Sequence, residues 1–368
     1  MSLEQLAVLS RFYGADPDYV IAGGGNTSFK DEKTLWIKSS GVSLATIEGG
    51  GFVAMDRAKL AAIWNTDYPE DPAKREAAVL ADLMAARKSG EENKRPSVET
   101  LLHDMLPFAY VVHTHPSLVN GLTCSVDGEA ALKSLLGDEP LWVPISDPGF
   151  VLAWAIRSGL SGRAEVPALV FLQNHGVFVG ADTPEAVKET YSRIVAAVGE
   201  KITRRPDFRG ECEAYGNSRE AGELLRKAAE SGGERRFVRF RRNNEIARLV
   251  KDRASFAPVS SAYTPDHIVY SGSDPLFIED AAETEEAFAA HSRKTGRPPK
   301  IAAVRNLGIF GIGSSEDGAV LALELFTDTM KVAAYAEAFG GPRFMTDEKI
   351  AFINNWEAER YRQKLAEK

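Results

Sequence analysis

Apolar and polar residues alternate along the chain with two periods, one typical of strands and one typical of helices. Short apolar runs bounded by turn residues predict strands at residues 19–22, 34–38, 52–56, 108–112 and 168–172. Stretches with apolar residues three and four apart predict helices at residues 3–13, 57–64, 72–88, 118–124, 128–136, 150–158, 184–201, 218–231 and 347–366. The mixture predicts a protein of the α/β class.

Two of the predicted helices have clear start signals. Asp71 stands before Pro72, and Thr183 stands before Pro184. The Asp or Thr side chain can accept a hydrogen bond from the first helical turn, and proline suits the first helical position because it lacks an N–H. We therefore expect helices to begin at these two prolines.

Three histidines follow predicted buried strands. His113 and His115 end the run from residue 108, and their spacing of two places both side chains on one face of a strand. His175 lies in the Asn-His-Gly turn after the strand at residues 168–172. Three neutral imidazoles with an open position are typical of catalytic zinc, whereas a structural site closes with four ligands. Buried histidines that serve only packing remain the alternative.

Only two cysteines, Cys124 and Cys212, occur in the chain, which excludes a cysteine-rich structural zinc site and a disulfide framework. The segments Pro96-Ser-Val-Glu99-Thr, His113-Thr-His115-Pro and Asn-His175-Gly resemble the class II aldolase/adducin family. The likeness is greatest to the aldolase portion of bifunctional rhamnulose-1-phosphate aldolase/lactaldehyde dehydrogenase enzymes, and it extends over nearly the whole chain.

The resemblance implies a fold, a metal and a catalytic group. The fold is a class II aldolase-like α/β/α sandwich with a central, mostly antiparallel sheet. His113, His115 and His175 would bind Zn²⁺ or another divalent metal. Glu99 would move the proton on carbon, and it is also a possible metal ligand. His103, inside a short predicted helix, is expected to support the site rather than to bind the metal.

A glycine-rich turn leads to Asn26, and a Ser-Ser-Gly turn contains Ser40 and Gly41. From the residues alone, hairpin turns that need glycine explain these segments as well as an anion site does. The resemblance implies that Asn26, Ser40, Gly41 and Ser97 bind the phosphate of the substrate. The family has a second serine after the position of Ser97, but this chain has Val98 there, so one phosphate donor is missing or is replaced by a backbone amide.

The activity implied is cleavage of a ketose 1-phosphate, similar to rhamnulose 1-phosphate, to dihydroxyacetone phosphate and an aldehyde. A sugar-phosphate epimerase, dehydratase or decarboxylase on the same scaffold is the alternative, because a fold does not fix a reaction. A non-enzymatic module of the adducin type is a second alternative, and the three histidines argue against it. A dehydrogenase part like that of the bifunctional relatives is not seen, so no nicotinamide chemistry is expected.

The second half of the chain contains a weak internal repeat. Residues 304–313 match residues 174–180 with one residue inserted, and Leu307 takes the place of His175. Residues 265–272 share an apolar frame with residues 107–115. We expect a degenerate aldolase-like half without metal ligands, in which His267 and His291 are packing or surface residues.

The predicted domains are a metal-binding class II aldolase domain, a linker with a helix, the degenerate half and a C-terminal helix, at residues 1–205, 206–235, 236–345 and 346–368. The formal net charge of −8 argues against a nucleic-acid partner or an anionic membrane surface. No apolar run approaches the ~18 residues of a transmembrane helix. We expect a cytoplasmic homo-oligomer that binds a small sugar phosphate.

Overall fold

The computed structural model of the protein describes residues 3–358 and residue 361. The chain divides into two compact units. Unit 1 consists of Met1–Thr123 and Asp127–Lys201, and unit 2 consists of Cys124–Val126 and Ile202–Lys368. The finer boundaries predicted at residues 235 and 345 stay predictions.

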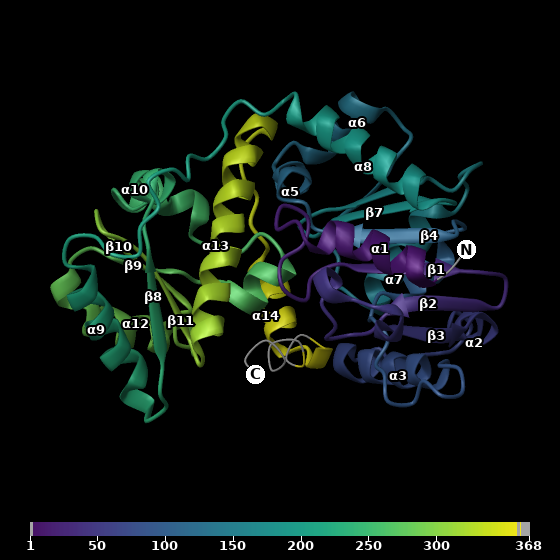
Figure 1. Ribbon diagram of the computed structural model, residues 1–368, viewed down its shortest axis with the longest axis horizontal. Helices are drawn as coiled ribbons and strands as arrows, with labels where there is room; N and C mark the ends of the chain where they lie inside the picture. Colours follow the sequence, from purple (N-terminus) through teal and green to yellow (C-terminus); the bar gives the residue numbers. More distant parts are fainter. Residues whose placement is uncertain (1–2, 359–360, 362–368) are drawn as a thin grey trace. The chain divides into compact units, whose positions relative to one another are not determined.

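Unit 1 is built on a seven-stranded sheet with the order β3-β2-β1-β4-β7-β6-β5. Figure 1 shows β3, β2, β1, β4 and β7 in this order. Its strands are β1 (Asn26–Lys30), β2 (Thr34–Lys38), β3 (Phe52–Asp56), β4 (Tyr110–Thr114), β5 (Leu141–Val143), β6 (Leu169–Leu172) and β7 (Gly176–Ala181). All neighbouring strands are antiparallel except β5 and β6. The predicted mixed α/β fold with a mostly antiparallel central sheet is confirmed.

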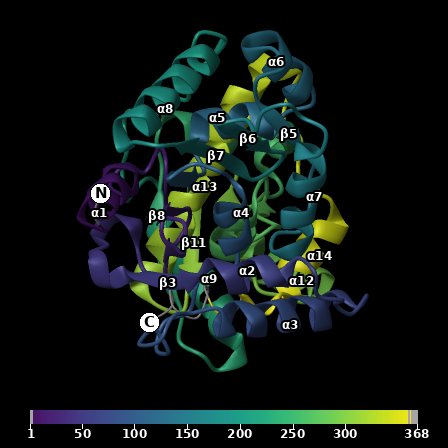
Figure 2. The same cartoon turned by 90° about the vertical axis from the view of Figure 1, so that its right-hand side faces the viewer.

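Helices cover both faces of this sheet (Figures 1 and 2). One face carries α2 (Arg57–Ile63), α3 (Pro72–Ala85), α4 (Thr100–Met105) and α7 (Phe150–Leu160), and their apolar side chains form one buried cluster with the sheet. The other face carries α1 (Leu3–Gly14), α5 (Ser117–Thr123) and α8 (Pro184–Gly199), while α6 (Gly128–Leu136) packs on α5. The central strands are therefore buried on both sides, as their continuous apolar runs predict.

The two predicted helix starts are confirmed. Asp71 Oδ1 accepts a hydrogen bond from Lys74 N at 2.9 Å, and Thr183 Oγ1 accepts one from Ala186 N at 3.2 Å. Both contacts satisfy N–H groups that have no partner within the helix.

The prediction of a strand at residues 19–22 is wrong. This segment forms turns, and the first strand begins only after the glycines, at Asn26. Tyr19 N donates to Asp16 O at 2.9 Å, and Tyr19 O accepts from His115 N at 3.1 Å. The segment is thus held by a turn and by the backbone of His115, which follows β4. It does not pair with a strand.

Unit 2 contains a four-stranded sheet with the order β8-β11-β10-β9. Its strands are β8 (Phe237–Arg241), β9 (Leu276–Ile278), β10 (Ile301–Val304) and β11 (Gly308–Gly313). On one face, α9 (Ser218–Ala229) and α12 (Thr284–Thr295) form an apolar cluster with the sheet. The opposite face packs on α10 (Asn244–Leu249), α11 (Arg253–Phe256) and α13 (Glu316–Ala336).

The order and directions of these four strands repeat the order β4-β7-β6-β5 of unit 1. β9 and β10 are parallel like β5 and β6, and the other two pairs are antiparallel in both sheets. The turns after β6 and β10 share one backbone form, because Asn174 and Asn306 both have a φ of 58°. Unit 2 therefore contains a topological copy of four of the seven strands of the first sheet.

The apolar frame that residues 265–272 share with residues 107–115 does not produce a counterpart of β4. His267–Ser271 forms a short π-helix, and the strand that takes the place of β4 in the copy is β8. The π-helix is tied to α13, because His267 Nε2 lies 2.8 Å from Asp328 Oδ2 and both side chains are buried. This buried polar contact replaces the apolar packing of a strand.

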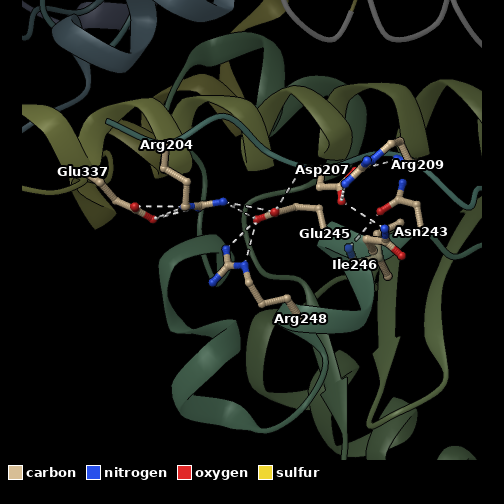
Figure 3. A network of polar contacts seen from close by, with 9 residues as sticks. Arg204, Asp207, Arg209, Asn243, Glu245, Ile246, Arg248 and Glu337 are labelled. Atoms are coloured by element: carbon tan, nitrogen blue, oxygen red, sulfur yellow. Dashed lines mark hydrogen bonds and ion pairs between the residues drawn. The ribbon is translucent and has the colours of Figure 1, made fainter. Parts of the chain in front are cut away.

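A polar network holds the start of unit 2 to two of its helices (Figure 3). Glu245 in α10 has a side chain only 3% exposed, and it accepts hydrogen bonds from Arg204 Nη1 at 3.1 Å and from Arg248. Arg204 Nη2 also donates to Glu337 Oε1 at 2.7 Å, just after α13. Asn243 caps α10 by accepting from Ile246 N at 2.9 Å.

The C-terminal helix predicted over residues 347–366 is interrupted. α14 spans Asp347–Asn355, and Trp356 has an extended backbone with ψ of 133°. Much of the rest of the predicted helix lies outside the described residues. Among the described helices, none has the length and apolar character needed to cross a bilayer.

Candidate metal centre

The three predicted metal ligands lie together in unit 1. His113 lies one residue before the end of the buried strand β4, His115 directly follows the strand, and His175 lies in the turn between β6 and β7. One ring nitrogen from each lies within 4.8 Å of those of the other two, and the Nε2 atoms of His113 and His115 are 3.0 Å apart. Antiparallel pairing of β4 with β7 brings the two sequence segments to the same end of the sheet.

His113 is the most tightly held of the three. Its side chain is fully buried, and its ring stacks on Phe178 with centroids 4.1 Å apart. Its Nδ1 donates to Val177 O at 3.1 Å. In a neutral imidazole this donor leaves Nε2 without a proton, which is the form that binds a metal.

The turn that carries His175 is fixed through its backbone. Asn174 adopts the left-handed conformation that asparagine tolerates well, and its N–H donates to Thr123 O at 3.1 Å. Asn120 Nδ2 donates to His175 O at 3.2 Å. The end of α5 therefore sets the position of the third imidazole.

Glu99 completes the cluster. It is the N-cap residue of α4 and is 5% exposed. Its Oε1 lies 3.6 Å from His113 Nε2 and 3.7 Å from His175 Nε2, and this buried oxygen has no hydrogen-bond partner. Its Oε2 accepts from Asn26 Nδ2 at 2.5 Å.

These groups fit a divalent metal ion. An unpartnered buried carboxylate oxygen is costly, and it faces two imidazole nitrogens whose distances leave space for a shared ion. Three imidazoles with one carboxylate are the nitrogen and oxygen ligands that zinc accepts. The donor set and the orphaned oxygen therefore both agree with a metal centre.

Gly176 allows the three histidine segments to approach closely. A Cβ atom at this position would lie 2.5 Å from Thr114 O and 2.7 Å from His115 Cδ2. We predict that Gly176→Ala lowers zinc affinity at least ~10-fold, because β4 and β7 must separate here, and destabilises unit 1 by about 1–3 kcal/mol. Zinc titration and urea unfolding measure the two effects.

Gly50→Ala is the matched control for this change, since a Cβ there meets nothing within 4 Å. Equal zinc affinities for the Gly176 variant and the control would contradict the proposed close packing.

Three of the residues predicted to bind phosphate, Asn26, Ser40 and Ser97, contact Glu99 or the segment that leads to it. Ser40 N donates to Arg95 O at 2.7 Å, and the preceding Ser39 bridges Pro96. Ser97 Oγ accepts from Glu99 N at 3.2 Å. Gly41 has a φ of 89°, a turn conformation that suits glycine.

Asn26 has both polar atoms of its side chain engaged, with Glu99 and with His103. The phosphate role of Asn26, Ser40, Gly41 and Ser97 stays a prediction.

Lys38 is a candidate phosphate-binding residue that the sequence analysis missed. It is 4% exposed at the end of β2, and its Nζ donates to Gly23 O at 3.1 Å. It thereby links the glycine-rich turn to the Ser-Ser-Gly turn. A lysine that ends an apolar strand just before a turn was the available signal, since lysine is rarely buried without a role.

Two titratable groups behind the metal centre have shifted pKa values. Burial, followed by the nearby His113 and Lys30, lowers the pKa of His103 well below its usual range. Burial also lowers the pKa of Lys30 from 10.5 to about 7, against the opposing effect of Asp104. Lys30 Nζ donates to His103 O at 2.6 Å, which joins β1 to α4.

The Lys30 shift predicts a pH-dependent stability. Between pH 7 and 10.5 the unfolded chain binds a proton at this amine that the folded chain does not. The free energy of unfolding therefore rises with pH across this window, by at most about 1.4 kcal/mol per pH unit. Lys30→Met should remove this slope, as measured by urea unfolding from pH 7.5 to 9.

Lys74→Met, at an exposed lysine of α3, should keep the wild-type slope. Equal slopes for the two variants would show that Lys30 titrates like a solvated lysine.

Comparison with known proteins agrees with this centre. Residues 4–198 match the family described as the class II aldolase and adducin N-terminal domain, which is more than half of the 368 residues. The protein therefore belongs to the class II aldolase and adducin family. The family and the three-histidine cluster together support a metal-binding enzyme of this superfamily.

The individual proteins that are similar to this chain have a low sequence identity to it. The uncharacterized oxidoreductase YuxG of Bacillus subtilis (strain 168) is 23% identical over 412 residues, which cover 99% of this chain and 58% of that protein. This chain thus spans less than two thirds of the length of that relative.

Two solved structures are also similar. The N-terminal class II aldolase domain of a conserved protein from Thermoplasma acidophilum has 27% identity and a TM-score of 0.47, covering 54% of this chain and 93% of that one. The L-fuculose-1-phosphate aldolase from Thermus thermophilus has 18% identity and a TM-score of 0.34, covering 53% of this chain and 90% of that one.

Proposed function

We propose that this protein is a zinc-dependent aldolase that cleaves a ketose 1-phosphate, similar to rhamnulose 1-phosphate, to dihydroxyacetone phosphate and an aldehyde. The observation that carries the proposal is the unpartnered Oε1 of Glu99, 3.6 and 3.7 Å from two imidazole nitrogens of a three-histidine cluster. A buried carboxylate beside a metal centre is suited to move a proton on carbon.

His113, His115 and His175 would hold the metal through ring nitrogens. A bound zinc ion supplies Lewis-acid polarisation of the substrate carbonyl. In the cleavage direction, the C3–C4 bond breaks as the C4 hydroxyl gives its proton to solvent and its carbon becomes the aldehyde carbon, and solvent restores the proton of Glu99 after each turnover. The electron pair passes to C3 and the adjacent carbonyl, and Glu99 in its acid form gives a proton to C3.

The phosphate of the substrate would lie at the convergent turns. Ser40 and Ser97 offer hydroxyl groups, and the turn at Gly41 offers backbone N–H groups. The Nζ of Lys38 adds a buried amine donor beside the glycine-rich turn. This arrangement would hold an anion at one end of the substrate and leave its carbonyl free to face the histidines.

The test is release of dihydroxyacetone phosphate from a panel of ketose 1-phosphates that includes rhamnulose and fuculose. Zinc-loaded protein is compared with protein treated with a chelator. We expect zinc-dependent release that ranks the sugars. No release from any of them, with zinc bound stoichiometrically, would overturn the aldolase proposal and favour the epimerase, dehydratase or decarboxylase alternatives. Failure to bind zinc would favour an adducin-like module.

The remaining expectations belong to the same proposal. We infer that the protein acts as a homo-oligomer in the cytoplasm, and light scattering of the purified chain tests its assembly. The absence of nicotinamide chemistry stays a prediction. One relative is named as an oxidoreductase, and this chain matches only 58% of its length.

A further inference from the structure

One face of β1 presents three polar side chains to α4. Asn26, Ser28 and Lys30 are spaced by two, so they point to the same side of the strand. α4 packs against β1, and Glu99 at its N-cap and His103 lie four residues apart, about one helical turn. Every one of the three β1 residues contacts Glu99 or His103.

The side chains form a continuous line of hydrogen bonds. Ser28 Oγ lies 2.7 Å from His103 Nδ1. His103 Nε2 contacts Asn26 Oδ1, and Asn26 Nδ2 donates to Glu99 Oε2 at 2.5 Å. All four residues are buried, with Ser28 and His103 fully enclosed. Solvent therefore has little access to replace a lost contact of Ser28 or His103.

The chemistry of the groups sets the direction of this line. The NH₂ group of Asn26 faces Glu99, because its Nδ2 donates to the carboxyl oxygen Oε2. The carbonyl oxygen of Asn26 then needs a donor, which is Nε2–H of His103. A neutral His103 has a bare Nδ1, and the hydroxyl of Ser28 donates to it.

The line ends on one oxygen of Glu99 and leaves the other one unpaired. Oε2 is fixed by Asn26, whereas Oε1 has no hydrogen-bond partner and faces His113 and His175. We propose that His103 is a positioning residue, which acts through Asn26 to hold Oε1 of Glu99 toward the metal centre. The catalytic consequence rests on the function proposed for Glu99, but the tautomer and the metal affinity do not.

Two substitutions of His103 separate positioning from simple packing. His103→Leu removes both ring nitrogens, and His103→Gln keeps an N–H group that can reach Asn26. We expect His103→Leu to lower kcat about 10–100-fold and to weaken zinc binding about 10-fold, as loss of groups that support metal ligands commonly does. The His103→Gln variant should recover most of the kcat and most of the zinc affinity.

Lys30→Met is the matched control, because it removes a contact to the backbone carbonyl of His103 and leaves the side-chain line intact. It should change stability with pH and leave kcat and zinc affinity unchanged. If Lys30→Met lowers kcat as much as His103→Leu does, the effect is general loosening of α4, and the proposal fails.

Nitrogen NMR of histidine-labelled protein tests the line without any assay of activity. The chain has six histidines, and substitution of His103 assigns its signals. We expect a neutral Nε2–H tautomer in the zinc-loaded wild type, and a Ser28→Ala variant in which this tautomer is less populated. A dominant Nδ1–H tautomer would overturn the proposed direction.

The two proposals fail in different ways. If the wild type releases no dihydroxyacetone phosphate but shows the expected tautomer and the zinc-affinity loss in His103→Leu, the positioning role stands and the aldolase proposal falls. If cleavage occurs and His103→Leu keeps full kcat and zinc affinity, the aldolase proposal stands and the positioning role is wrong.

Discussion

His113→Ala should leave a protein that retains no zinc and releases no detectable dihydroxyacetone phosphate. His113 offers Nε2 to the centre from a fully buried ring, and its Nδ1 contact with Val177 O fixes that orientation. Loss of a group that merely supports a ligand costs about 10–100-fold in affinity, so loss of the ligand itself should cost more. Metal analysis after gel filtration and zinc titration measure the change.

His291→Ala is the matched control, because this histidine of α12 stands outside the cluster and makes a hydrogen bond to Asp274 O. His175→Ala should behave like His113→Ala. His113→Gln is a second variant that removes the imidazole and fills more of the buried space than alanine does. It separates loss of the ligand from misfolding. Stoichiometric zinc in a folded His113 variant would contradict the three-histidine centre.

Glu99→Gln should retain zinc and lose turnover. Glutamine has nearly the volume of glutamate, and its carbonyl oxygen can still accept from Asn26. It cannot give or take the proton on carbon, a contribution worth about 10²–10⁴ in rate for a general acid or base. We therefore expect kcat to fall by about that factor, with zinc bound at the wild-type stoichiometry.

Glu129→Gln, at an exposed glutamate of α6, should keep the wild-type kcat. An active Glu99→Gln enzyme would reject Glu99 as the proton-transfer group. Loss of zinc from the same variant would instead show that Glu99 acts mainly as a metal ligand.

The pattern of the sequence predicts that the three histidines lie close together, as they do in the structure. The alternation along β4 places His113 on one face of the strand, and the structure shows it beside His115 and stacked on Phe178. Period-two alternation and a turn at a strand end are local features, so they can be interpreted without a structure. The helix starts at Asp71 and Thr183 are local features of the same kind.

The parts that sequence analysis missed depend on distant residues. Ser28 and His103 are 75 residues apart, and their contact arises only when α4 packs on β1. Likewise the apolar run at residues 265–272 resembles a strand, but the contact of His267 with Asp328 ties it to α13 as a π-helix. Tertiary contacts of this kind override local preference.

The turn that carries His175 has a second version in unit 2. Asn306 has the same φ of 58° as Asn174, and Val304 pairs with Gly308 as Leu172 pairs with Gly176. The copy keeps this shape with Leu307 in place of the imidazole. The backbone of the turn therefore does not depend on a bound ion. Uptake and exchange of an ion at the proposed metal centre would then not require refolding of the loop.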